Sequence, residues 1–130
     1  MEDGVHQRAE WEFPSETPHP ATWPVGEARA IALGLLADAA LVALLTIDTQ
    51  RRVVYVKQGG RAVAELALDH GVIVVGARRE PIIELEIELR QAGTRADLDA
   101  LAVALREHIA IVPEPRSKLA RGLALLAATV

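Results

Sequence analysis

The chain has 130 residues, of which 51% are hydrophobic and only 3% aromatic, and its formal net charge is -4 at pH 7. This length predicts one domain, or a piece of one, with a core of aliphatic side chains. The negative charge argues against binding of a nucleic-acid polymer over a broad electrostatic surface. The lack of cysteine excludes disulfides and thiolate chemistry. No apolar run approaches the roughly 20 residues of a membrane span, and the start lacks signal-peptide features. We therefore expect a cytoplasmic protein that does not enter a membrane.

The N-terminal third of the chain predicts a strand, a loop and a helix. Residues 7–13 alternate between charged and apolar side chains, which is typical of a strand with one solvated face. Four prolines between Pro14 and Pro24 predict a loop. Apolar side chains then recur at helical spacing, which predicts a helix from Gly26 to about Ala40.

The middle of the chain predicts four short strands. Their ranges are Thr46–Lys57, Arg61–Asp69, Val72–Val75 and Ile82–Arg90. Turns are expected at Gly59-Gly60 and at His70-Gly71, and an exposed loop is expected at Arg78-Arg79. Because these connections are too short for parallel crossovers, the sheet should be antiparallel.

Two helices are predicted after the strands. Thr94 with Asp97 three residues later resembles a capping box, and an apolar stripe at helical spacing follows it. Ser117 can cap a last helix from about Lys118 to Ala128. The predicted fold class is therefore α+β, with an antiparallel sheet and helices packed on it.

The strand-like run from Ile82 to Arg90 is the most informative feature for function. It places Glu84, Glu86 and Glu88 together on one face of the strand and aliphatic side chains on the other. A solvated sheet face would account for this pattern. The alternative is a cation-binding surface, because acidic side chains also lie on one face of the strands predicted over residues 7–13 and Arg61–Asp69. Carboxylates suit hard cations such as Mg²⁺ or Mn²⁺.

Several stretches, taken in order, resemble the CYTH family, also called triphosphate tunnel metalloenzymes. The matching segments are Glu10–Pro14, Thr49–Arg52, Glu65–Gly71, Glu84–Leu89 and Pro115–Gly122. The family's N-terminal Glu-x-Glu-x-Lys strand has no counterpart here. Residues 1–130 therefore resemble the C-terminal half to two-thirds of such a domain.

The resemblance implies an antiparallel sheet that forms part of a triphosphate-tunnel-like barrel, with helices outside. It implies metal binding by acidic tunnel residues, namely Glu84, Glu86, Glu88, Asp69 and Glu12. It also implies phosphate contacts from Lys118 and from Arg52, or from Arg51 if the register differs by one residue, because such a slip exchanges the two faces of a strand.

The function implied for the complete domain is hydrolysis of a triphosphate-containing substrate with Mg²⁺ or Mn²⁺, by in-line attack of water. The missing acidic strand keeps open a second hypothesis, a module that binds polyphosphate or a nucleotide without turnover. A third hypothesis is a structural fragment that forms a homodimer through an open sheet edge. In this family a helical, phosphate-binding CHAD domain often follows, so such a partner domain after Val130 is a further expectation.

Overall fold

The computed structural model describes Val5 and residues 7–129, which fall into two compact units. The first unit spans residues 5–43 and holds a short 3₁₀ turn and a helix. The second unit begins at Leu44 and holds a sheet and two further helices. None of the helices found in the described ranges combines the length and apolar character that a membrane crossing requires.

The first unit is built around its helix. The 3₁₀ turn η1 (Pro20–Thr22) leads into α1 (Glu27–Leu36). Ala37 stops α1 short of the predicted end at Ala40, because its φ of 49° lies in the left-handed region, where a helix cannot continue.

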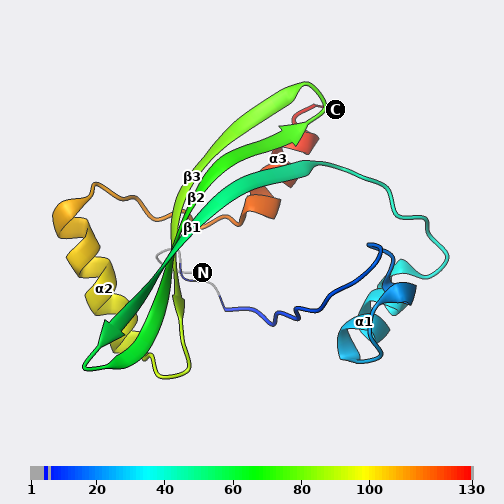
Figure 1. The fold of residues 1–130 in the computed structure, drawn as a ribbon. Coiled ribbons are helices and arrows are strands. Elements are labelled where there is room, and N and C mark those ends of the chain that lie inside the picture. Colours follow the sequence, from blue (N-terminus) through cyan, green and yellow to red (C-terminus); the bar gives the residue numbers. More distant parts are fainter. Residues whose placement is uncertain (1–4, 6, 130) are drawn as a thin grey trace. The chain divides into compact units, whose positions relative to one another are not determined.

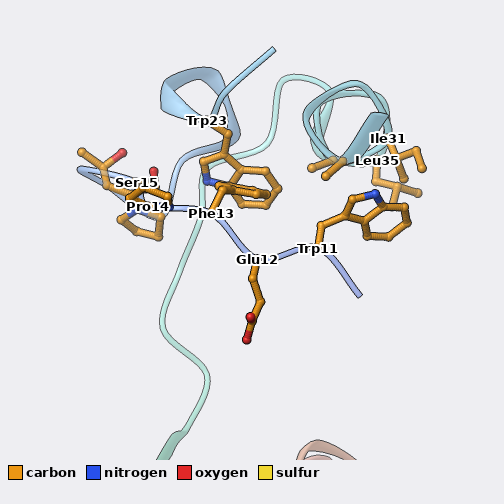
Figure 2. Close-up of a pocket in the computed structure, with 12 residues that line it drawn as sticks. Trp11, Glu12, Phe13, Pro14, Ser15, Trp23, Ile31 and Leu35 are labelled. Atoms are coloured by element: carbon orange, nitrogen blue, oxygen red, sulfur yellow. The ribbon is translucent and has the colours of Figure 1, made fainter. Parts of the chain in front are cut away.

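The strand predicted over residues 7–13 is wrong, since this segment has no regular secondary structure. Alternation gives a segment one wet and one apolar face, but a strand also needs a neighbour to satisfy its backbone hydrogen bonds. No strand in the described part of the chain pairs with it. The aromatic side chains of Trp11 and Phe13 instead line a pocket with Trp23 and α1, and the Phe13 and Trp23 ring centroids lie 5.2 Å apart (Figure 2).

The second unit contains a three-stranded antiparallel sheet with the strand order β1-β2-β3 (Figure 1). The strands are β1 (Thr46–Gln58), β2 (Arg61–Val75) and β3 (Arg78–Leu89). Gly59 and Gly60 form the predicted turn between β1 and β2, and both have positive φ. A second turn at Gly76, with φ of 58°, joins β2 to β3.

The turn predicted at His70-Gly71 is wrong, because β2 is one continuous strand of 15 residues. Gly71 serves a different purpose. A Cβ atom on it would lie 1.9 Å from the backbone oxygen of Asp48, so only glycine lets β1 and β2 approach this closely. The extended β2 also pairs with the Arg78-Arg79 segment, which therefore belongs to β3 and not to the predicted loop.

The two predicted helices of this unit are confirmed. They are α2 (Arg95–His108), with the Thr94–Asp97 capping box formed, and α3 (Lys118–Ala127), capped by the Ser117 hydroxyl. Leu125 and Leu126 of α3 pack against the buried core of Ile73, Val75 and Ile82, near the turn that joins β2 to β3. Figure 1 shows α2 beside the opposite end of the sheet.

The predicted α+β class is confirmed by this sheet and its helices. The described strands form an open sheet, in which β2 is central and β1 and β3 are the edges. Closure into a triphosphate-tunnel-like barrel therefore stays a prediction.

Candidate functional site

One face of the sheet brings acidic and basic side chains into adjacent rows. The register places Arg51 opposite Asp69, and Asp69 opposite Glu84, in a single row across all three strands. The next row ends in Glu86, which is opposite the small residue Ala67. Directly opposed residues share a face and lie within contact distance. The register alone thus gathers three carboxylates and one guanidinium.

Helix α3 adds two cations to these rows. Lys118 and Arg121 are three residues apart, so they project from the same side of the helix. Gly122 lies next to them and is buried, and a Cβ atom on it would lie only 2.9 Å from a methyl carbon of Leu45. The missing side chain lets α3 lie close to the sheet, with both cations over the carboxylates. We call the set formed by Arg51, Asp69, Glu80, Glu84, Glu86, Lys118 and Arg121 the charged cluster.

Asp69 is the buried centre of the charged cluster, with a side chain that is 0% exposed. Arg51 donates two hydrogen bonds to its two carboxylate oxygens, from Nε and Nη2, each 2.7 Å long. Lys118 Nζ lies 2.8 Å from Asp69 Oδ2. The hydrogen bonds from Arg51 outweigh the opposing effect of burial and, with Lys118, lower the pKa of Asp69 to about 2. Asp69 is therefore a permanent anion at neutral pH.

Lys118 joins the carboxylates of β2 and β3. Besides Asp69, its ammonium contacts Glu84 Oε2 at 3.0 Å and makes a shorter contact with Glu86 Oε1. Burial alone would lower the pKa of Lys118, but hydrogen bonds to Asp69, Glu86 and Glu84 raise it above its ordinary value. The ammonium therefore stays charged and neutralises part of the repulsion between the three carboxylates.

Arg121 holds the outer edge of the charged cluster on β3. Its guanidinium donates to Glu80 at 3.2 Å, to the backbone oxygen of Pro81 at 2.9 Å, and to Glu84 Oε1. Glu84 is thus fixed from two sides, by Arg121 on one oxygen and by Lys118 on the other. Arg121 and Glu80 were not predicted from the sequence. The position of Arg121 three residues after Lys118, on a helix with a predicted cap, was a usable signal for Arg121.

The structure separates the two arginines that the sequence could not distinguish. Arg51 lies in the row of Asp69, while Arg52 is opposite Leu68 and so lies on the other face of the sheet. Only Arg51 belongs to the charged cluster, and it also donates to Glu86 at 3.0 Å.

Two other predicted acidic residues lie outside the charged cluster. Glu88 is exposed and opposite Glu65, nearer the β1–β2 turn, where Arg90 bridges to Glu65 at 3.3 Å. Glu12 belongs to the first unit, and Figure 2 shows its side chain directed away from the rings of Trp11 and Phe13. Their metal-binding roles stay predictions.

The pocket of the first unit has a different chemistry. It is an open hollow of about 960 Å³, and its walls include Trp11, Phe13, Trp23, Ile31 and Leu35 (Figure 2). Its lining, as far as the structure describes it, contains no basic side chain. Arginine and lysine make the strong, charge-assisted hydrogen bonds to phosphate, so the charged cluster and not this pocket is the candidate site.

The charged cluster has the ligand type that Mg²⁺ or Mn²⁺ requires, since its carboxylate oxygens are hard donors. Its arrangement does not fit a metal, however. Asp69, Glu84 and Glu86 already converge on Lys118. Within residues 5 and 7–129, no group of three or more histidine, aspartate or glutamate side chains is placed to hold a metal ion.

Comparison with known proteins gave one family and no structural neighbour. The CYTH domain family matches residues 2–123 of the chain, which includes every strand and most of α3. Members of this family generally bind triphosphates and depend on divalent metal. No solved structure matched the chain.

Proposed function

This chain belongs to the CYTH domain family, and from that membership we propose that its charged cluster binds the phosphates of a triphosphate-containing substrate. Guanidinium and ammonium groups are the side chains that suit phosphate oxygens. Three of them, on Arg51, Lys118 and Arg121, lie on one face of the sheet beside each other. Each of the three is also paired with a carboxylate of the charged cluster, so a phosphate would be bound by donors that these pairs leave unused.

The observation that supports this proposal best is the orientation of Arg51. Its Nε and Nη2 atoms donate to Asp69 and Glu86, which fix the plane of the guanidinium. Its Nη1 atom has no hydrogen-bond partner among the described residues, and the side chain is 45% exposed. A fixed and partly exposed guanidinium with an unused donor can bind a phosphate oxygen while keeping its carboxylate partners.

We extend the proposal to a reaction class: the domain hydrolyses a phosphoanhydride bond of the bound triphosphate. A divalent metal would polarise phosphoryl oxygens in such a reaction. The described residues would contribute binding and orientation, through Arg51 on a phosphate and through Asp69, which holds Arg51 in place. Such positioning and charge stabilisation account for most of the catalysis in phosphoryl transfer.

One observation favours a second candidate, a module that binds triphosphate without turnover. The carboxylates that would hold a metal are engaged by cationic side chains. Under this alternative, tripolyphosphate would bind equally well with and without a chelator, and no phosphate would be released.

A third candidate, self-association, is favoured by the open edges of the sheet. In the described chain, β1 and β3 each pair with β2 on one side only. Unpaired edges of 12 and 13 residues invite pairing with a second copy. Light scattering at micromolar concentration tests this, and a monomer would contradict it.

Calorimetric titration with inorganic tripolyphosphate, without metal, tests binding at the charged cluster. The chain offers a matched pair of variants, because Arg51→Ala and Arg52→Ala remove the same charge from neighbouring positions on opposite faces. We expect Arg51→Ala to weaken binding at least tenfold, and Arg52→Ala to change it less than twofold. Equal losses in both variants, or no binding by the folded wild-type chain, would contradict the proposal.

Release of phosphate from tripolyphosphate in the presence of Mg²⁺ tests the reaction class. Hydrolysis by the wild-type protein that is lost in Arg51→Ala and kept in Arg52→Ala would support the hydrolase. Binding without any release, under the same conditions, would favour the non-catalytic module.

A further inference from the structure

The two edges of the sheet differ in how well they are protected from a further strand. On β3, Pro81 has no N–H to donate, and its carbonyl oxygen already accepts a hydrogen bond of 2.9 Å from Arg121 of α3. A proline within the strand and a covering side chain are common ways of blocking a sheet edge. β1 contains no proline, and the irregularity in its pairing with β2 lies after Val56, near the end of the strand. The edge of β1 is therefore the better suited of the two to accept a partner strand.

β1 also carries unpaired charges and exposed apolar side chains. Asp48 and Arg52 lie on the face of the sheet opposite the charged cluster, and both are exposed. Neither has an ion-pair partner among the residues that the structure describes. On the face of the charged cluster, the Ile47 and Val53 side chains are 37% and 38% exposed. A long edge strand with apolar side chains left in water is a template for association.

A two-fold axis brings these side chains of two copies into complementary pairs. When two copies of one strand pair in antiparallel, opposed side chains lie on the same face, so the axis passes through a residue and not between two residues. An axis at Gln50 opposes Asp48 of each copy to Arg52 of the other copy. The same axis opposes Ile47 to Val53. Directly opposed charges of opposite sign, and directly opposed apolar side chains, both stabilise a sheet.

Other positions of the axis are less favourable. An axis at Arg51 or at Arg52 opposes that arginine to its own copy, and like charges directly opposite each other destabilise a sheet. With the axis at Gln50, Arg51 is opposite the neutral Thr49. The charge of Arg51 is also balanced within its own chain, by Asp69. The distribution of charge along β1 thus favours the Gln50 axis.

We propose that two copies of this chain pair β1 with β1 in antiparallel about a two-fold axis at Gln50, which joins the two sheets into one. The pairing uses Thr46–Val54, and so it lies before the irregularity of β1. The charged clusters of both copies then lie on the same face of the joined sheet, because a two-fold axis normal to a sheet keeps its faces. The inference gives the self-association candidate a defined surface, and it does not depend on phosphate binding.

Reversal of charge in two separate variants tests both the pairing and its register. Asp48→Arg opposes cations at both ends of the pairing, and Arg52→Asp opposes carboxylates there. Each variant alone should therefore dimerise at least tenfold more weakly than the wild type. When the two variants are mixed, every opposed charge again meets its opposite, so heterodimers should form with an affinity like that of the wild type. Sedimentation velocity at micromolar concentration measures the three samples, and circular dichroism checks that each variant is folded.

Arg79→Glu is the control for this experiment. It reverses a charge at an exposed position of the other edge strand, β3, and should change dimerisation less than twofold. A wild-type chain that stays monomeric, or a mixture that is no more dimeric than its separate variants, would overturn the proposal. Dissociation by Arg79→Glu, with dimers kept in both β1 variants, would also overturn it. Tripolyphosphate binding by a monomeric wild type would leave the phosphate-binding proposal standing and remove only this inference.

A cross-linking measurement identifies the residue at the axis. The chain has no cysteine, so one introduced thiol is the only thiol present. Opposed residues of an antiparallel pair have Cα atoms about 4.5–5.5 Å apart, which is within the range that a disulfide spans. Gln50→Cys should therefore form covalent dimers in mild oxidant much faster than Arg79→Cys. Equal rates of cross-linking in the two variants would overturn the proposed alignment.

Discussion

Two ends of the same sheet face hold acidic side chains in different environments. In the row of Asp69, α3 covers the sheet, and the carboxylate is fully buried between Arg51 and Lys118. In the row of Glu65, nearer the β1–β2 turn, the ion-pair partner of the carboxylate among the described residues is the partly exposed Arg90. The Arg90 guanidinium lies 5.4 Å from the centre of the Tyr55 ring. The alternating strand pattern is the same at both ends. Because α3 covers only the row of Asp69, that row forms a network of ion pairs around a buried carboxylate, while the row of Glu65 stays partly exposed to solvent. The alternating strand pattern does not cause this difference.

The largest expected difference between the two rows is in the effect of removing a carboxylate. Asp69→Ala leaves Arg51 and Lys118 without their buried partner, so it should lower the free energy of unfolding by about 3 kcal/mol. Glu65→Ala removes an exposed pair and should lower it by less than about 1 kcal/mol. Urea denaturation of both variants measures the difference, and equal effects would show that α3 does not bury the Asp69 row.

The next prediction concerns the contact that produces the cover. Gly122→Leu would push α3 away from Leu45 and the sheet, and should lower the free energy of unfolding by about 2 kcal/mol. It should also expose the Lys118 ammonium, which lies one turn away on the same helix.

Gly34→Leu is the matched control for this helix contact. Gly34 also lies within a helix, but a Cβ atom there meets nothing within 4 Å. Thermal unfolding should show little change in this control, and a loss as large as that of Gly122→Leu would contradict the role of close helix packing.

Low pH should remove the contribution that ionised Asp69 makes to the free energy of unfolding. The pKa of Asp69 is lowered to about 2 by Arg51 and Lys118, below the value near 4 of an unfolded chain. A group with a lowered pKa stabilises the fold above its unfolded pKa, and this contribution disappears as the pH falls through the folded value. The wild type should therefore lose on the order of 2 kcal/mol between pH 5 and pH 2, relative to Asp69→Asn.

The measurement for this prediction is a pair of denaturation series across that pH range. The difference in unfolding free energy between wild type and Asp69→Asn should be largest above about pH 5 and should shrink toward pH 2. A difference that stays constant with pH would contradict the assigned shift.

The smallest expected effect belongs to the exposed row. Arg90→Ala removes the bridge to Glu65 and the contact with the Tyr55 ring, each of which is partly exposed to water. The expected loss is about 0.5 kcal/mol, and added salt should reduce it further. If Arg90→Ala lowered the free energy of unfolding more than Gly122→Leu does, the row of Glu65 would matter more for stability than the row of Asp69, contrary to our expectation.

The sequence predicted local structure well wherever the local signal was sufficient. Thr94 with Asp97, and Ser117 before Lys118, marked both helices of the second unit, because a cap is a contact between residues three apart. Gly59-Gly60 marked a turn for a similar reason. The turn predicted at His70-Gly71 failed because a glycine within a strand can also be required where a neighbouring backbone comes very close. That contact is made with a distant part of the chain, so the local sequence does not reveal it.

For the candidate site, the sequence by itself determined which residue types were available and which of them share a strand face. The alternation of β3 placed Glu84 and Glu86 together, since the side-chain period of a strand is two. Only the tertiary structure decided that Arg51 and not Arg52 faces them, because strand register is set by pairing with β2 and not by the sequence of β1 alone. The tertiary structure also decided that Lys118 lies among the carboxylates. The packing of α3 close to the sheet depends on Gly122 and on a core built by residues distant in the sequence.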